Sequence, residues 1–126
     1  MKHRVLFFIS GVLNILWGIA HLFPTKGIVR DFGDISMDNR HIILMEWINE
    51  GFTLIFIGLL VILVTLVRSD DLKVKRMVYL LSFAMLIAMA ILSLFTGFKV
   101  DFIPFKLCPL IFSISAVLIL FGTLKK

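Results

Sequence analysis

Apolar residues in this chain gather in four long stretches that are separated by short polar segments. The stretches cover residues 5–23, 42–67, 77–98 and 103–124. Each meets or nearly meets the length of about 20 apolar residues that a helix needs to cross a bilayer. The turns that follow the second and third stretches are short, which favours helices running up and down beside one another. The pattern therefore predicts an all-α polytopic membrane protein, an antiparallel four-transmembrane-helix bundle that forms a single domain over residues 1–126.

The connection between the first two stretches is a long outer loop with signals of its own. Pro24 should end the first helix, because proline cannot continue a helix cleanly. Gly27 and Gly33 mark turns. Two interpretations stay open, a short interfacial helix over the outer mouth of the bundle or an ordered loop that covers the helix ends. Asp38 or Asn39 is expected to cap the second helix. The apolar residues that recur here at near-helical spacing are Ile28, Val29, Phe32 and Ile35.

Glu50 interrupts the second apolar stretch at a depth in the membrane where a carboxylate has a high free-energy cost. An ionisable residue inside a membrane span is by default a hypothesis of a functional site. Glu46 lies one turn earlier on the same face, since residues four apart stack on a helix. Asn49 and Thr53 complete this polar arc. The second helix is therefore expected to turn a polar face towards the interior of the bundle.

The first helix carries a matching polar arc, formed by Asn14, Trp17 and His21. Glycines recur at the same spacing on both helices, which lets two helices approach closely along small residues. The simplest arrangement packs helices 1 and 2 together with their polar arcs facing one cavity. The glycines are Gly11 and Gly18 in the first helix and Gly51 and Gly58 in the second.

Counting about 1.5 Å of rise per residue from the outer helix ends gives the expected levels of these groups. Glu46 should lie level with His21, and Glu50 with Trp17 and Asn14. Lys106 of the fourth helix falls in the same outer half. Beyond Thr53 the polar face of the second helix turns apolar, and no ionisable residue follows in the inner half of any helix. The pattern predicts a pocket that is closed at its base rather than a path through the membrane.

The distribution of charge predicts how the helices are oriented across the membrane. The net charge of +5 follows the distribution of membrane loops and is no sign of nucleic-acid binding. Both termini and the loop at 68–76 should be cytoplasmic, and we expect the inner (plasma) membrane of a bacterium. The chain begins like a signal peptide, but Asn14 and Trp17 favour a retained span. Eight cations fall on the expected inner side (Lys2, Arg4, Arg68, Lys73, Lys75, Arg76, Lys125, Lys126) and five on the outer side (Lys26, Arg30, Arg40, Lys99, Lys106).

Each candidate group also has a structural interpretation. Glu46 and Glu50 could be paired with cations to hold the bundle together, since buried charges need partners. Trp47 fits the aromatic belt at the outer interface. A zinc or iron site would need His21, Glu46 and Glu50 to converge, and no tight metal motif supports one. We therefore predict no metal, and the sequence identifies no cofactor.

The pattern that several of these residues form resembles that of a known protein family. The string Gly11-x-x-Asn14-x-x-Trp17-Gly18-Ile19-Ala20-His21-Leu22-Phe23-Pro24, followed by Glu50 ahead of Gly58-Leu59-Leu60, is similar to the DoxX-like family of small four-helix membrane proteins. The extra Glu46 departs from that pattern. The resemblance implies a four-helix subunit or accessory of redox or assembly systems, some of them linked to quinones, with His21 and Glu50 as the positions carried over.

Together these observations favour a small integral membrane binding or accessory subunit rather than an enzyme. We expect an outer-leaflet pocket for a lipid-like or quinone-like molecule, or for a partner helix of another membrane protein or a second copy. Two alternatives stay open, an intramembrane enzyme using His21 with Glu46 or Glu50, and a small oligomeric transporter. The residues expected to line the pocket are Asn14, Trp17, His21, Glu46, Asn49, Glu50 and Lys106.

Overall fold

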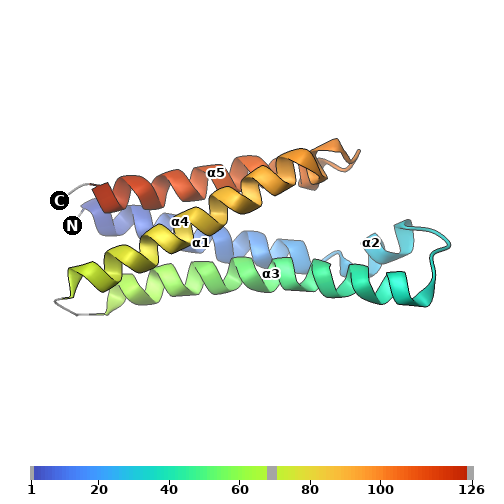
Figure 1. The fold of residues 1–126 in the computed structure, drawn as a ribbon, viewed down its shortest axis with the longest axis horizontal. Coiled ribbons are helices and arrows are strands. Elements are labelled where there is room, and N and C mark those ends of the chain that lie inside the picture. Colours follow the sequence, from blue (N-terminus) through green and yellow to red (C-terminus); the bar gives the residue numbers. More distant parts are fainter. Residues whose placement is uncertain (1, 68–70, 125–126) are drawn as a thin grey trace.

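The structure, a computed structural model, describes residues 2–67 and 71–124. These residues form five α-helices and one 3₁₀ turn and contain no strand (Figure 1). The predicted all-α fold is confirmed. The elements are α1 (Lys2–Leu22), α2 (Thr25–Asp31), α3 (Met37–Leu66), α4 (Leu72–Phe95), the 3₁₀ turn η1 (Gly97–Lys99) and α5 (Ile103–Leu124).

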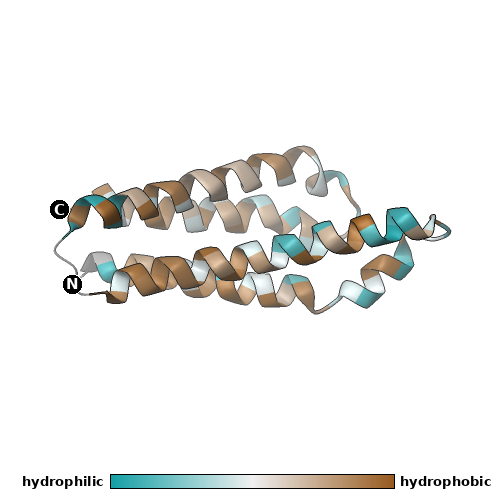
Figure 2. Cartoon of the chain, turned by 60° about the horizontal axis from the view of Figure 1, so that its bottom comes forward, coloured by the Kyte–Doolittle hydropathy of each residue, from teal (hydrophilic) through white to brown (hydrophobic). Residues whose placement is uncertain are grey.

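Four of these helices, α1, α3, α4 and α5, are long and apolar enough to cross a membrane. Apolar residues cover the middle of the bundle, while polar residues collect at one end, in α2 and in the first turns of α3 (Figure 2). The protein is therefore an integral membrane protein. The chain starts and ends at the same end of the bundle, where α3 is followed by α4 (Figure 1).

The helices form two tightly packed pairs, α1 with α3 and α4 with α5, and the pairs meet mainly through α1 and α5. Helix α4 starts beside α3 and then crosses the bundle to lie beside α5 (Figure 1). As a result, α3 and α4 are in contact over little of their length. The bundle is least closed between these two helices, towards the end that carries α2.

The close packing of α1 on α3 depends on glycine, as the sequence predicts. A Cβ atom added at Gly58 would lie 2.5 Å from the carbonyl oxygen of Gly11, and one added at Gly18 would lie 2.7 Å from that of Gly51. Real side-chain atoms do not fit at such distances. The two helices can therefore approach this closely only because all four positions lack a side chain.

The interior below the α2 end is apolar and tightly filled. Its completely buried apolar side chains come from three helices, among them Leu54, Leu86 and Phe112, and Phe7 of α1 packs with them. One buried polar network joins α1 to α5. Asn14 donates to the carbonyl oxygen of Ser10 (2.9 Å) and to Oγ of Ser115 (2.6 Å). Leu54, one turn after Glu50 on α3, belongs to the apolar core.

Several helix ends differ from the predicted ones. Helix α3 begins at Met37 rather than at 42, and its N-cap is Ser36, whose hydroxyl accepts from the backbone N–H of Asn39 (3.2 Å). Asp38 and Asn39 are thus not the cap. Helix α4 begins at Leu72 rather than at 77, capped by Asp71. The polar first turns of both helices hid these starts, because hydropathy marks only the apolar part of a helix. The predicted turn at 68–71 falls mostly outside the described residues.

The connection between α1 and α3 contains a short helix, α2, as one of the two interpretations of its sequence expected. It is shorter than the apolar spacing suggests, because the chain leaves helical geometry after Asp31 and turns at Gly33 with a φ of 70°. Glycine adopts this left-handed conformation without the clash that a Cβ atom causes. Helix α2 packs on α3, which extends beyond the last residue of α1 (Figure 1).

Candidate functional site

His21 and Trp47 form the centre of the polar region at the α2 end. The imidazole of His21, in the last turn of α1, stacks on the indole of Trp47 in α3 with ring centroids 3.9 Å apart and planes 20° apart. Both side chains are buried. Trp47 was expected in a belt at the membrane interface, and this prediction is wrong. The apolar indole instead fills the contact between α1 and α3.

Trp47 also fixes the start of α2. Its indole N–H donates to Oγ1 of Thr25 (3.1 Å), and that hydroxyl donates to the carbonyl oxygen of Leu22 (2.6 Å). On its other side, Trp47 meets the ring of Phe105 edge to face, with centroids 5.4 Å apart. One tryptophan thus connects the end of α1, the first residue of α2 and the beginning of α5. A buried tryptophan usually needs such a partner for its N–H.

Glu50 lies one turn after Trp47 and approaches the same histidine. Its Oε2 atom is 3.7 Å from Nε2 of His21, and its side chain is 33% exposed, whereas that of His21 is 5% exposed. This separation is too long for a direct hydrogen bond. Nε2 of His21 accordingly has no hydrogen-bond partner. The pair leaves two polar atoms side by side that a third group could bridge.

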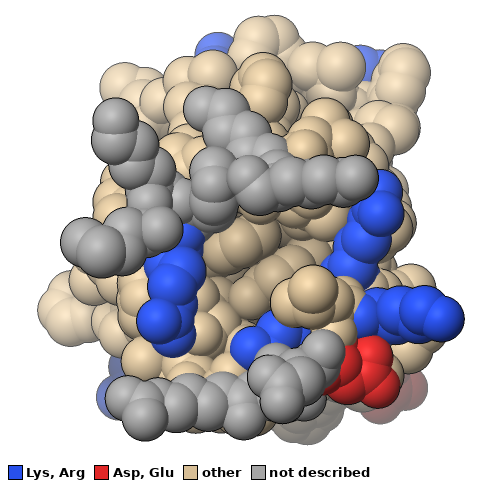
Figure 3. Space-filling view, turned by 90° about the vertical axis from the view of Figure 1, so that its left-hand side faces the viewer, with Lys and Arg blue, Asp and Glu red and all other residues tan. Residues whose placement is uncertain are grey.

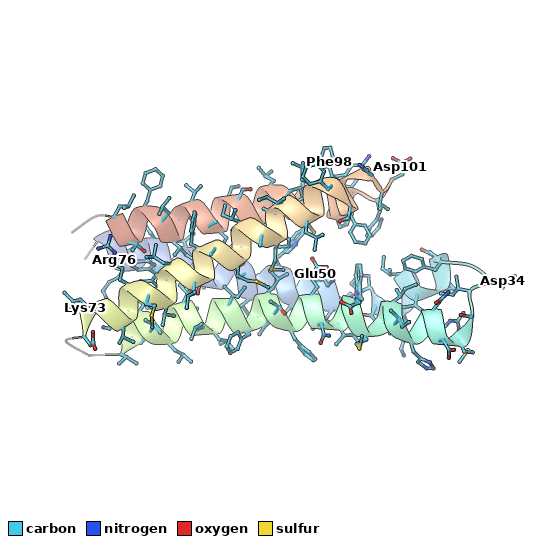
Figure 4. The ribbon with its side chains drawn as sticks, viewed as in Figure 1. Asp34, Glu50, Lys73, Arg76, Phe98 and Asp101 are labelled. Atoms are coloured by element: carbon cyan, nitrogen blue, oxygen red, sulfur yellow. The ribbon has the colours of Figure 1, made fainter. Side chains whose placement is uncertain are left out.

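Glu50 faces a large opening between α3 and α4, which we call the lateral groove (Figure 4). Its volume is about 660 Å³. Glu46, Asn49 and Thr53 share the α3 wall with Glu50, and the opposite wall is mostly apolar. The lining residues from α4 and its following turn are Met85, Met89, Leu92, Ser93, Thr96, Gly97 and Val100.

A second, smaller cavity lies on the other side of the histidine, and we call it the aromatic chamber. It has a volume of about 150 Å³. It shares Trp47, Phe105 and Cys108 with the lateral groove, so the two cavities are adjacent there. The remaining lining residues are Trp17, Ala20, His21, Pro24, Phe102 and Pro104.

The sequence-predicted residues divide between these two cavities, and two of them belong to neither. Trp17 and His21 line the chamber, while Glu46, Asn49 and Glu50 line the groove. Asn14 lines neither, because its amide is completely buried against Ser10 and Ser115 of the α1–α5 contact.

Lys106, like Asn14, lines neither cavity. Its ammonium group pairs with the carboxylate of Asp101 (3.1 Å) in the turn before α5. Lys106 and Asn14 were both predicted to line the pocket, and the structure places neither of them in a cavity wall.

The predicted levels also need correction. His21 lies beside Glu50 and not beside Glu46, which is exposed. The prediction assumed that helices 1 and 2 end at the same outer plane. Because α3 begins at Met37 and extends past the end of α1, each of its residues lies nearer the α2 end of the bundle, relative to α1, than that assumption gives.

The metal alternative finds no support in this geometry. Within residues 2–67 and 71–124, no three His, Cys, Asp or Glu side chains lie close enough together to hold a metal ion. His21 and Glu50 come together, but Glu46 does not join them as a third ligand.

Sequence reasoning missed several residues that shape the site. Phe105 and the α4 residues of the groove wall were not singled out, because apolar side chains carry no signal that separates a cavity wall from a lipid-facing surface. Thr25 had a weaker signal, as a hydroxyl directly after Pro24. The inward direction of Trp47 could have been inferred, since it lies three residues before Glu50 and shares its face.

Comparison of the chain with family models, with curated proteins and with solved structures finds no match.

Proposed function

We propose that this integral membrane protein is a binding or accessory subunit that holds a lipid-like or quinone-like molecule in the lateral groove. Glu50, in the groove wall, is the polar anchor for the molecule, and His21, which lines the adjacent aromatic chamber, is the second polar contact. The observation that carries the proposal is the position of the Glu50 carboxylate, 3.7 Å from His21 in the wall of a cavity of about 660 Å³.

The composition of the groove suits an amphipathic molecule. One wall carries Glu46, Asn49, Glu50 and Thr53, and the facing wall carries methionine, leucine and valine side chains. Ligand sites typically combine mainly apolar walls with a few convergent polar groups that fix orientation. Methionine-rich surfaces adapt to ligands of irregular shape. A chain-like tail could therefore lie against α4 while its head meets α3.

The free-energy cost of placing the Glu50 carboxyl group within a membrane span supports a role in binding. A carboxyl group within a span is rare unless it has a partner or a function. Among the described residues, the only ion pair of Glu50 is the one with His21, which is itself short of a hydrogen bond. A ligand that hydrogen-bonds to both groups would supply the partner that the bundle does not.

The orientation and the cellular location are part of the proposal. The end of the bundle seen in Figure 3 carries several Lys and Arg side chains around an uncharged centre, with acidic atoms at one edge. Arg4, Lys73, Lys75 and Arg76 belong to the elements at this end. Following the positive-inside rule, we place this end in the cytoplasm and the groove in the outer half of a bacterial inner membrane. We also propose membership of the DoxX-like family.

Photocrosslinking from the groove wall tests the proposal. A photoreactive amino acid replaces Leu92, which lines the groove, and in a matched variant it replaces Leu81 of the same helix, which does not. Both leucine side chains are 64% exposed. After irradiation in the native membrane, mass spectrometry identifies the attached molecules. We expect one small-molecule class to be enriched at Leu92 relative to Leu81.

Two outcomes would count against the proposal. If both positions attach the same mixture of bulk lipids, the groove has no ligand of its own. If Leu92 attaches a peptide instead, the groove holds a partner helix and the small-molecule proposal is wrong.

A further inference from the structure

The aromatic chamber combines two unsatisfied polar atoms with a lining of flat rings. Among the described residues, the buried indole nitrogen of Trp17 and the buried Nε2 atom of His21 have no hydrogen-bond partner of good geometry. The Trp17 side chain interacts with the sulfur of Cys108, which is a weak acceptor. Trp17 and His21 both line the chamber, and they lie one turn apart on the same face of α1. Buried polar groups in proteins are almost always hydrogen-bonded, so each exception calls for an explanation. Two exceptions in one cavity point to a missing partner that occupies it.

The size and lining of the chamber limit what that partner is. A cavity of about 150 Å³ lined by apolar side chains holds one benzene-sized ring, and the chamber has this volume. Its walls include Trp17, Trp47, Phe102 and Phe105, whose rings offer faces and edges to a planar guest. Of the residues that the structure describes, no Lys, Arg, Asp or Glu lines it. A charged head group such as a phosphate would therefore find no counter-ion there.

We infer that the aromatic chamber binds a single six-membered ring that carries a hydroxyl or carbonyl oxygen. The ring lies among the aromatic walls. Its oxygen accepts a hydrogen bond from the indole N–H of Trp17 and lies within hydrogen-bonding distance of Nε2 of His21. The inference rests on the proposed function in one respect, since the ring is taken as one part of the molecule that Glu50 anchors in the adjacent lateral groove. It narrows the ligand class from amphipathic molecules in general to those with an oxygenated ring.

The test compares two radiolabelled probes that differ only in the ring oxygen, 4-decylphenol and decylbenzene. Binding is the excess of probe retained by vesicles containing the protein over protein-free vesicles of the same lipid. One neutral hydrogen bond contributes enough for a preference of about 3- to 10-fold. We expect the phenol to bind tighter than the hydrocarbon by that factor, after each value is corrected for its own partition into lipid.

Two variants locate the effect. Trp17→Phe keeps a ring but removes the indole N–H, so the preference for the phenol should fall to less than about 2-fold. Ala20→Phe places a ring in the chamber lining and should weaken both probes together. Helix content by circular dichroism shows that each variant is folded. Unchanged phenol preference in Trp17→Phe, equal binding of the two probes to the natural protein, or no binding of either probe would overturn the inference.

The outcome of this probe-binding test can be distinguished from the outcome of the crosslinking test of the proposed function. Crosslinking at Leu92 reports on the groove whether or not the chamber takes a ring. A specific molecule at Leu92 without a ring oxygen, together with no phenol preference, would leave the groove as the binding site and remove only the chamber.

Discussion

The imidazole of His21 lies flat against the indole of Trp47, with ring centroids 3.9 Å apart. This contact joins the last turn of α1 to α3 and holds the histidine where Glu50 reaches it. The same indole anchors Thr25 at the start of α2. The stack is therefore both part of the fold and the support of the candidate site.

Replacing Trp47 should destabilise the α2 end of the bundle. Trp47→Ala removes a buried ring, a hydrogen bond to Thr25 and the surface on which His21 packs. Large-to-small changes of this kind cost about 3–5 kcal/mol in the free energy of unfolding. Unfolding in detergent, followed by circular dichroism, measures the loss. Trp47→Phe, which keeps a ring but loses the N–H donor, should lose clearly less, and equal losses would contradict the role of the stack.

The glycine contact between α1 and α3 gives a second prediction. In Gly58→Ala the new methyl group would lie 2.5 Å from the carbonyl oxygen of Gly11, so the helices must move apart. We expect a loss of about 1–3 kcal/mol, the usual cost of overpacking, measured by the same unfolding experiment. Gly27→Ala is the control, because a Cβ atom at Gly27 meets nothing within 4 Å. If both variants unfolded alike, the close approach of the helices would be wrong.

Asn14 should matter for stability and not for binding. Asn14→Ala removes one buried hydrogen bond from α1 to Ser115 of α5 and one within α1, to the carbonyl oxygen of Ser10. Hydrogen bonds between membrane helices contribute about 0.5–2 kcal/mol, so the variant should be less stable by that amount. The yield of molecules crosslinked at Leu92, per folded protein, should be unchanged. A selective loss of crosslinking would return Asn14 to the binding site.

The orientation predicts which loops react with a reagent that cannot cross membranes. Asp34 and Lys73 lie at opposite ends of the bundle (Figure 4). A cysteine at Asp34 should react with an impermeant maleimide in intact cells, and a cysteine at Lys73 only after the membrane is opened. Cys108→Ala provides the background, although the natural thiol is buried. The reverse labelling pattern would place the groove in the cytoplasmic half.

Much of the fold could be predicted from the sequence, for a physical reason. Only apolar stretches of membrane length satisfy the bilayer, and short turns leave few ways to arrange four helices. The glycines of α1 and α3 then fix one helix pair, because their spacing matches on both helices and the structure brings them together. These features depend on local pattern alone, so they can be deduced without coordinates.

The candidate site was harder to predict, because it depends on the ends and rotations of helices. The proximity of His21 to a glutamate was expected, yet the partner is Glu50 and not Glu46, since α3 extends further out than its apolar part shows. Asn14 turns to Ser115 because α5 packs against α1, a contact that no pattern in either helix reveals. Lys106 has a nearer partner in the preceding turn, Asp101.

Native mass spectrometry of the protein released from nanodiscs tests the central claim most directly, by comparing Glu50→Gln with Lys106→Gln. The amide keeps the size of the side chain but cannot carry the carboxylate's charge, whereas Lys106 lines neither cavity. The natural protein and Lys106→Gln should retain the same bound mass, and Glu50→Gln should lose most of it. The same bound mass in all three, or none in the natural protein, would show that Glu50 does not anchor a ligand in the groove.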